Sequence, residues 1–333
     1  MSLPPADLVL PRPGSAPNPP KPPIPAPPES AFTSTFGALL PPAQYLHTPA
    51  GRAAYYSLPP SSASASSPGP SPARVLLLHG VQTPALGLVP LARALAAAFP
   101  STHFVLPDLW GHGLSDTPVL PHAAPLFHGL LDALLDALAW PAAHLVGFSF
   151  GGALAATYAA SRPARVQSFA LVAPAGLLRS AGFTDEERGY LRGGGDEVAA
   201  RRWVLRWLEG GDLVVPADWR ERVGRGEVVA EAVRAWQMRE HRGHGASVVA
   251  VFRDGGTMDS DTEFVKAVRT GIPALAVLGG LDDVCSEHEL RELGFVDVAV
   301  VPQAGHGVVR ERVPEVAALI SEFWTKLDKA SSG

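Results

Sequence analysis

A glycine–X–serine–X–glycine pattern constrains this chain more than any other feature of its sequence. The run GFSFGG at 147–152 continues an apolar segment, AHLVGF at 143–148, and opens an alanine-rich segment that predicts a helix to residue 160. A tight turn from a strand into a helix leaves no room for side chains two residues either side of its tip, so glycine is needed there. The pattern therefore predicts that Ser149 projects its hydroxyl from such a turn, at the positive end of the helix dipole.

Apolar runs and helical patterns alternate along most of the 333 residues. A hairpin with arms at 45–46 and 53–57 is expected first. The remaining strands are expected at 74–80, 102–108, 143–148, 166–173, 272–280 and 295–303. Helices are expected at 86–98, 124–139, 151–160 and 314–327. Strands that alternate with helices of this length predict an α/β fold, with a mainly parallel sheet covered by helices on both faces.

Other stretches depart from this alternation. Residues 177–252 are mostly helical and carry four of the seven tryptophans, so we expect a helical cap inserted late in the sheet, over the strand ends where open α/β sheets bind ligands. Residues 1–42 open with twelve prolines in the first 30 and predict a disordered tail, a linker or alternatively a PxxP ligand for a partner domain. Residues 57–73 predict a surface loop and 329–333 a disordered end. The α/β core is then 43–176 and 253–328.

Charge and cysteine content exclude several classes of protein. With 27 basic and 32 acidic residues and a net charge of −5, the chain lacks the basic face of a nucleic-acid-binding protein. Its single cysteine, Cys285, excludes an intramolecular disulfide and a cysteine-based zinc site. No apolar run approaches the ~18 residues of a membrane span, and the N-terminus lacks the pattern of a signal peptide. The expectation is a cytoplasmic protein with no membrane span.

A nucleophilic serine needs a base, and the base needs an acid that fixes its tautomer. His306, in QAGHGVV, directly follows the last predicted strand, and Asp282 and Asp283 follow the strand before it. The chain order Ser149, aspartate, His306 is the order of an α/β enzyme with a nucleophile elbow. His241 and His244 are three residues apart, but with no third ligand in reach by sequence they are expected at a solvated helix end, and no metal or other cofactor is expected.

Four motifs in this order resemble the α/β-hydrolase superfamily. They are LLLHGV (76–81), PDLWGHGLSD (107–116), GFSFGG (147–152) and the pair GGLDD and AGHG (279–283 and 304–307). The resemblance implies that Asp282 is the acid, with Asp283 as the alternative. It also implies that the backbone amides of Val81 and Phe150 form an oxyanion hole, whereas His79 and His112 brace loops.

The resemblance implies a serine hydrolase that works through an acyl-enzyme. The expected substrate is a small, largely apolar carboxylic ester, thioester or lactone. Alternatives on the same triad are a carbon–carbon bond hydrolase or an acyltransferase, and an alternative of another class is a ligand receptor with negligible turnover. The cap tryptophans are expected mainly to pack, but an aromatic cap suits an apolar substrate, so Trp203, Trp207 and Trp236 are candidates for substrate binding.

Overall fold

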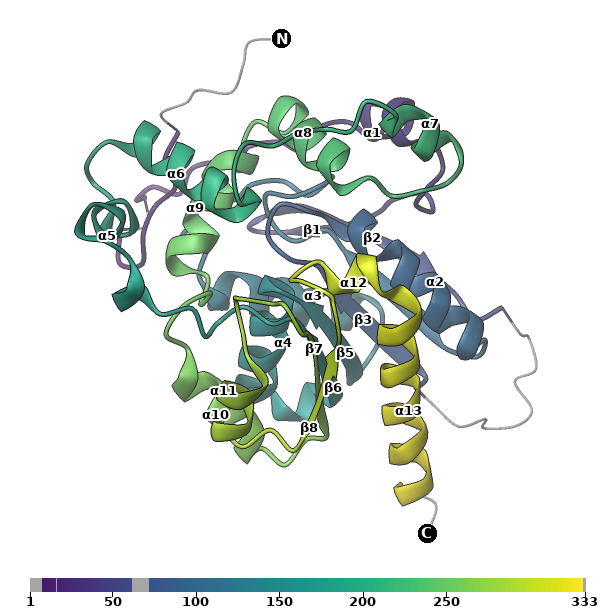
Figure 1. Cartoon of the computed structure of the whole chain (residues 1–333). Coiled ribbons are helices and arrows are strands. Elements are labelled where there is room, and N and C mark those ends of the chain that lie inside the picture. The colour runs from purple at the N-terminus through teal and green to yellow at the C-terminus, as the bar shows by residue number, and fades with distance from the viewer. Residues whose placement is uncertain (1–7, 16, 62–71, 332–333) are drawn as a thin grey trace.

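The computed structural model describes residues 8–15, 17–61 and 72–331, and eight of its strands form one twisted sheet (Figure 1). The strands are β1 Gln44–Thr48, β2 Gly51–Leu58, β3 Arg74–Leu78, β4 His103–Pro107, β5 Ala143–Phe148, β6 Val166–Val172, β7 Ala274–Gly279 and β8 Asp297–Val301. Their order across the sheet is β1-β2-β4-β3-β5-β6-β7-β8. The β1–β2 and β2–β4 pairs are antiparallel, whereas every pair from β4 to β8 is parallel. The prediction of a mainly parallel sheet that begins with a hairpin is confirmed.

Helices cover both faces of the sheet because successive side chains of a strand point to opposite sides. On β3, Val75 and Leu77 belong to one buried cluster and Leu76 and Leu78 to the other. The first face is covered by α2 (Val89–Ala98), preceded by the 3₁₀ turn Ala85–Leu88, and by α12 (Val308–Glu311) and α13 (Val313–Ser331). The second face is covered by α3 (Ala124–Ala137), α4 (Phe150–Ser161) and α10 (Asp261–Arg269), while α11 (Glu287–Glu292) flanks β8. Strands buried on both sides explain why they appear in the sequence as unbroken apolar runs.

The expected helical cap lies between β6 and β7. It consists of α5 (Asp185–Arg192), α6 (Glu197–Glu209), α7 (Trp219–Gly224), α8 (Ala230–Glu240) and α9 (His244–Asp254). Thr184 caps the start of α5, because its hydroxyl accepts a hydrogen bond from the Glu187 amide and the Glu187 carboxylate accepts one from the Thr184 amide. None of the helices in the described ranges combines the length and the hydropathy required to cross a bilayer.

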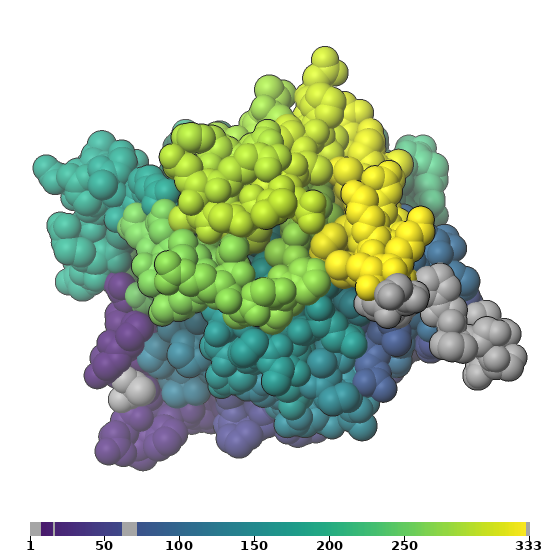
Figure 2. Space-filling view, turned by 90° about the horizontal axis from the view of Figure 1, so that it is seen from below, coloured from purple at the N-terminus to yellow at the C-terminus, as the bar shows by residue number. Residues whose placement is uncertain are grey.

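The expected disorder of residues 1–42 is wrong for the part of that segment that the structure describes. Residues 8–15 and 17–28, here called the N-terminal strap, contain no helix and lie on the outside of the molecule (Figure 2). Helix α1 (Glu29–Phe36) follows. Leu10 is buried against α9, and Phe32 and Phe36 are buried against Trp236 of the cap. Prolines without an aliphatic pattern predicted disorder, but a few apolar side chains spaced along an extended chain are enough to anchor it.

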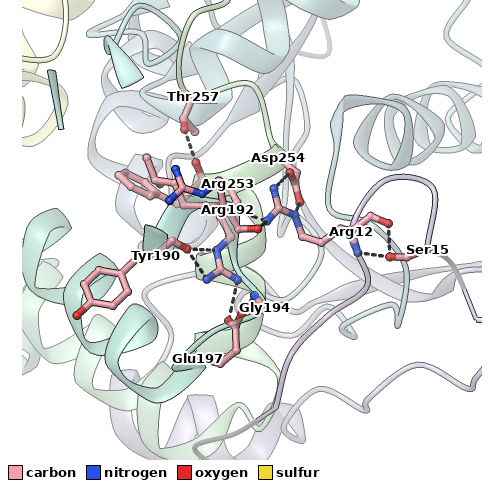
Figure 3. A network of polar contacts seen from close by, with 11 residues as sticks. Arg12, Ser15, Tyr190, Arg192, Gly194, Glu197, Arg253, Asp254 and Thr257 are labelled. Atoms are coloured by element: carbon pink, nitrogen blue, oxygen red, sulfur yellow. Dashed lines mark hydrogen bonds and ion pairs between the residues drawn. The ribbon is translucent and has the colours of Figure 1, made fainter. Parts of the chain in front are cut away.

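Hydrogen bonds fasten the strap at both ends. Its C-terminal half pairs with the core, where Ile24 and Thr117 exchange backbone hydrogen bonds of 2.8 and 2.9 Å and the Asp116 carboxylate accepts from the Ala26 amide. Its N-terminal half reaches the cap, where Arg12 donates to Asp254 at 2.6 Å and to the Arg192 carbonyl at 2.8 Å (Figure 3). The strap therefore links the last turns of α5 and α9 to the loop after β4.

The other expected loops and ends differ in smaller ways. Helix α13 continues to Ser331, so the expected disordered end at 329–333 is wrong as far as residue 331. Of the expected loop at 57–73, residues 57–58 complete β2, and residues 62–71 lie outside the described part of the chain.

The strap yields a prediction about stability. Replacing Arg12 with Gln leaves the Asp254 carboxylate, which is largely buried, without its ion-pair partner. We expect the free energy of unfolding to fall by about 1–3 kcal/mol, as for other charged hydrogen bonds lost from partly buried sites. Urea unfolding measures this directly. Lys21→Gln, at an exposed strap position, is the control and should change stability by less than about 0.5 kcal/mol; equal values for both variants would show that the strap does not stabilise the fold.

Candidate active site

Three side chains from three different loops meet at the carboxyl ends of the parallel strands. Ser149 follows β5, Asp282 follows β7 and His306 follows β8. The Ser149 hydroxyl lies 2.9 Å from Nε2 of His306, and Nδ1 of His306 lies 3.2 Å from each carboxylate oxygen of Asp282. With the Nδ1 proton directed at Asp282, Nε2 is free to accept the serine proton. The structure thus brings together the three residues that the sequence selected.

The backbone at Ser149 has an unusual conformation, with φ 53° and ψ −117°. A non-glycine residue in this region costs on the order of 1–3 kcal/mol, and the surrounding hydrogen bonds hold it in place. The Ser149 amide donates to the Val172 carbonyl of β6, and the Ser149 carbonyl accepts from the amides of Gly152, Ala153 and Ala175. The strained turn is therefore tied to the neighbouring strand and to the first turn of α4.

The glycines of the motif are explained by close packing around this turn. A Cβ at Gly147 would clash with the carbonyl of Gly151, and one at Gly151 would clash with the carbonyl of Leu78 in β3. A Cβ at Gly152 would lie 2.9 Å from Cβ of Pro174. Since the first two obstacles are backbone atoms, no change of rotamer relieves them, and the pattern predicted from the sequence has a direct steric cause.

The two candidate acids occupy different places. The Asp282 side chain is fully buried, and besides facing His306 it accepts a hydrogen bond of 2.9 Å from the Val284 amide. Asp283 instead lines the cavity in front of Ser149. Of the carboxylates among the described residues, only that of Asp282 lies within hydrogen-bonding distance of His306, which favours it as the acid.

The loop that carries the expected oxyanion donor passes directly over Ser149. A Cβ on Gly80 would lie 3.0 Å from Cβ of Ser149, and Val81 lines the same cavity as the serine hydroxyl. The second expected donor, the Phe150 amide, belongs to the first turn of α4, where amides have no partner within the helix. His79 braces this loop: its Nδ1 donates to the Gly80 carbonyl at 2.7 Å and its Nε2 accepts from the Leu109 amide at 2.8 Å.

His79 is one of several buried histidines that connect the loops below the cap. His112 donates to the Trp110 carbonyl, and His241 and His244 bond the carbonyls of Ser115 and Gly111. The expected solvated helix end at His241 and His244 is wrong, because both side chains are buried against the loop after β4. Burial lowers the pKa of His79 to about 4 and that of His244 to about 3, so both are neutral at pH 7. No cluster of three metal-binding side chains occurs among the residues that the structure describes.

A cavity of about 700 Å³ opens in front of Ser149 and His306. Trp203 and Trp207 of α6 line it together with Phe252 of α9. Trp236, the third tryptophan selected from the sequence, does not: it is 1% exposed, packs on α1 and donates to the Ala31 carbonyl. The sequence could not separate the three, because each lies on a cap helix and only the packing of α6 and α8 decides which face meets the cavity.

Polar residues that sequence reasoning missed also line this cavity. Glu209 accepts from the Gln82 amide group at 2.9 Å and pairs with Arg234 at 3.2 Å, and Arg310 lies nearby on α12. Burial raises the pKa of Glu209. The only signal in the sequence was the position of Arg310, four residues after His306; nothing marked Gln82, Glu209 or Arg234, which come from distant segments.

Known proteins share part of this sequence and its fold. Residues 73–194 match the family model described as alpha/beta hydrolase fold. The chain is 31% identical over 233 residues to the dihydrolipoyllysine-residue acetyltransferase component of the acetoin cleaving system of Pseudomonas putida, covering 66% of this chain and 55% of that protein. It is 41% identical over 115 residues to lipase LipV of Mycobacterium tuberculosis, covering 33% and 41%. The matches thus span about half the length of these relatives.

A solved structure with the same fold is a thermophilic esterase from Thermogutta terrifontis. It superposes with a TM-score of 0.61 over 86% of this chain and 99% of the esterase, at 19% sequence identity. At this identity the likeness establishes the fold alone.

The steric cause of the glycine pattern gives a second prediction. Gly147→Ala forces Cβ against the Gly151 carbonyl, so we expect a loss of several kcal/mol in the free energy of unfolding or a displaced Ser149 with little remaining activity. Gly129→Ala is the matched control, since Gly129 lies within α3 with nothing within 4 Å of its Cβ position. That substitution should stabilise the protein by about 0.5–1 kcal/mol. Similar denaturation curves for the two variants would contradict the proposed steric cause.

The buried histidines predict a loss of stability in mild acid. Burial lowers the pKa of a group of them to about 4, namely His79, His122, His128 and His144. An unfolded histidine titrates near 6.5, so below that pH the unfolded chain binds protons that the folded state excludes. The free energy of unfolding should therefore fall steeply from pH 6.5 to about 4, as urea titrations at fixed pH would show. His288→Gln, at an exposed site, should leave this slope unchanged; a flat profile in wild type would contradict the prediction.

Proposed function

Because the chain belongs to the α/β-hydrolase fold superfamily, we propose that it is a serine hydrolase that cleaves a carboxylic ester, thioester or lactone. The observation that carries the proposal is the chain of contacts from Ser149 through His306 to Asp282, at 2.9 and 3.2 Å. A serine within hydrogen-bonding distance of a histidine whose other nitrogen faces a buried carboxylate has the geometry for nucleophilic catalysis.

In this mechanism Ser149 attacks the carbonyl carbon of the substrate while Nε2 of His306 removes its proton. Asp282 keeps the His306 Nδ1 proton in place and stabilises the imidazolium that forms. The backbone amides of Val81 and Phe150 are the proposed donors to the tetrahedral oxyanion, and each such donor contributes on the order of 3 kcal/mol to lowering the barrier. His306 then protonates the leaving group, and a water activated by the same histidine hydrolyses the acyl-enzyme.

The cavity supports a substrate with an apolar part. Trp203, Trp207 and Phe252 form one wall, and a volume of about 700 Å³ is in the range of pockets for small organic molecules. The similarity to lipase LipV supports ester hydrolysis among the reactions open to this triad. No step of this mechanism requires a cofactor, and a cytoplasmic location stays a prediction from the sequence.

Transfer of the acyl group to an alcohol or thiol is the second candidate. It is favoured by the 31% identity to an acetyltransferase component. Both reactions share the acyl-enzyme and differ only in what attacks it, so one assay separates them. When a p-nitrophenyl ester reacts with the enzyme in the presence of an added alcohol, a hydrolase releases mainly the free acid, whereas an acyltransferase forms mainly a new ester with the alcohol.

The proposal predicts covalent labelling at one residue. Wild type should gain one fluorophosphonate adduct by intact mass, and Ser149→Ala should gain none. Ser149→Ala and His306→Ala should each lower kcat toward p-nitrophenyl butyrate by about 10³-fold or more while the folded state persists. Asp282→Asn should cost about 10²–10⁴-fold and more than Asp283→Asn.

A matched control separates catalysis from stability. His47, exposed on β1, can be replaced by Ala and should retain wild-type activity. Absence of an adduct on folded wild type would overturn the hydrolase proposal and favour a ligand receptor. A larger effect at Asp283 than at Asp282 would overturn the assignment of the acid.

A further inference from the structure

We propose that Arg310 forms a carboxylate-binding subsite in the cavity, so that the preferred substrate is an ester or related acyl compound that also carries an acidic group. This inference rests on the proposed function and names the class of substrate for the same site. It depends on where Arg310 lies, on its lack of a partner and on the charges around it.

Arg310 lies beside the catalytic side chains. It follows His306 by four residues on α12, and its guanidinium carbon lies 5.2 Å from the centre of the Phe148 ring. The other neighbour of that ring is the His306 imidazole, at 5.4 Å between centroids. Arg310, Phe148, His306 and Ser149 all line the one cavity. A group bound by Arg310 is therefore held in the space where the acyl or leaving group of a substrate must lie.

The guanidinium of Arg310 has no carboxylate partner among the described residues. It stacks on Phe148, and within that part of the chain it donates no hydrogen bond and forms no ion pair. Burial, followed by the like charge of Arg234, lowers the pKa of Arg310 to about 10, so the group is still a cation at pH 7. A cation held in a cavity without a counter-ion is costly, and binding an anion would offset that cost.

Three carboxylates, those of Glu231, Glu311 and Glu209, act electrostatically on Arg310, and Arg234 already pairs with two of them. Glu209 lies 3.2 Å from one terminal nitrogen of Arg234, and Glu231 lies 3.2 Å from the other. The second oxygen of Glu209 accepts from Gln82. Two carboxylates therefore converge on one arginine, and the second arginine, Arg310, is left to face the cavity. Arg206 also lines the cavity, but its side chain is mostly exposed and lies 3.9 Å from Asp212.

The charge balance favours a singly charged, planar group. Glu209 and Asp283 also line the cavity and would repel a dianion such as a phosphate monoester. A single guanidinium offers two parallel N–H donors, which match the two oxygens of a carboxylate. The wall formed by Trp203, Trp207 and Phe252 suits an apolar portion of the same molecule. We therefore expect an acidic compound with both a carboxylate and an apolar part.

The test compares matched esters that differ only in charge. The probes are the mono-p-nitrophenyl esters of succinic, glutaric and adipic acid and their methyl-capped neutral counterparts. For wild type, kcat/KM should be at least about 10-fold higher for the acid at the best chain length. Arg310→Met, which keeps an unbranched side chain over Phe148, should reduce the acid-to-neutral ratio by about 10–100-fold, as expected for a lost hydrogen bond to a charged group.

Two further variants make the result specific. Arg310→Lys keeps the charge and should retain part of the preference for the acid. Arg312 lies two residues after Arg310, and its guanidinium is 3.7 Å from the Glu315 carboxylate. Arg312→Met should therefore leave the acid-to-neutral ratio at the wild-type value. The loss in Arg310→Met should appear mainly in KM, because the carboxylate is remote from the reacting carbonyl. A wild-type ratio of one or less for all three lengths, or the same ratio in Arg310→Met, would overturn the subsite.

A binding measurement separates failure of the subsite from failure of the proposed function. By calorimetry, Ser149→Ala should bind 4-phenylbutanoate more tightly than 4-phenylbutanol, and adding Arg310→Met should abolish the difference. If no ester is hydrolysed and no fluorophosphonate adduct forms, the proposed function fails, while selective binding of the acid still supports the subsite. Equal binding of 4-phenylbutanoate and 4-phenylbutanol would overturn the subsite. Stronger competition with 4-phenylbutanoate by inorganic phosphate than by acetate would also overturn it.

Discussion

The turn at Ser149 is the constraint on which the rest of the site depends. A left-handed serine between β5 and α4 is held because its backbone bonds β6 and the helix, and because glycines at 147 and 151 let the neighbouring backbones approach. Gly151 also lets the first turn of α4 lie against the Leu78 carbonyl of β3. The parallel sheet then places the loops after β7 and β8 beside the serine, so that Asp282 and His306 complete the site.

The loops above the sheet are held by neutral buried histidines instead of by ion pairs. His79 fixes the loop that carries Val81, and His112 accepts from the Gln82 amide at 3.3 Å. Gln237 of the cap helix α8 accepts from the Gly113 amide and donates to the Gln82 carbonyl. A neutral imidazole both donates and accepts, so it can join two backbone segments without the cost of burying a charge. The cap and the loop beside the serine are thereby connected through the same set of hydrogen bonds.

The N-terminal strap adds a second connection between cap and core. One short segment bonds the loop after β4 through Ile24 and bonds the ends of α5 and α9 through Arg12. Helices α6 and α9 carry the aromatic wall of the cavity. Because the strap is bonded to the end of α9, it helps to position this wall without itself lining the cavity. The proposed carboxylate subsite lies on α12, which belongs to the core and not to the cap. The core would therefore hold the charged end of a substrate, and the cap would hold its apolar part.

Much of this protein was determined by sequence alone, because it depends on local geometry. The strands predicted at 74–80 and 143–148 and the glycine turn each follow from residues a few positions apart, and their predicted bounds agree with the structure to within a few residues. Ser149 and His306 were selected from their places after predicted strands, and Asp282 from the family resemblance, and the structure brings the three within hydrogen-bonding distance. The tertiary structure alone decided which tryptophan faces the cavity, that the strap is ordered, that His241 and His244 are buried, and that Arg310 lacks a partner. These depend on contacts between segments up to 242 residues apart, such as Arg12 and Asp254, and no local pattern encodes which buried surface a distant segment will meet.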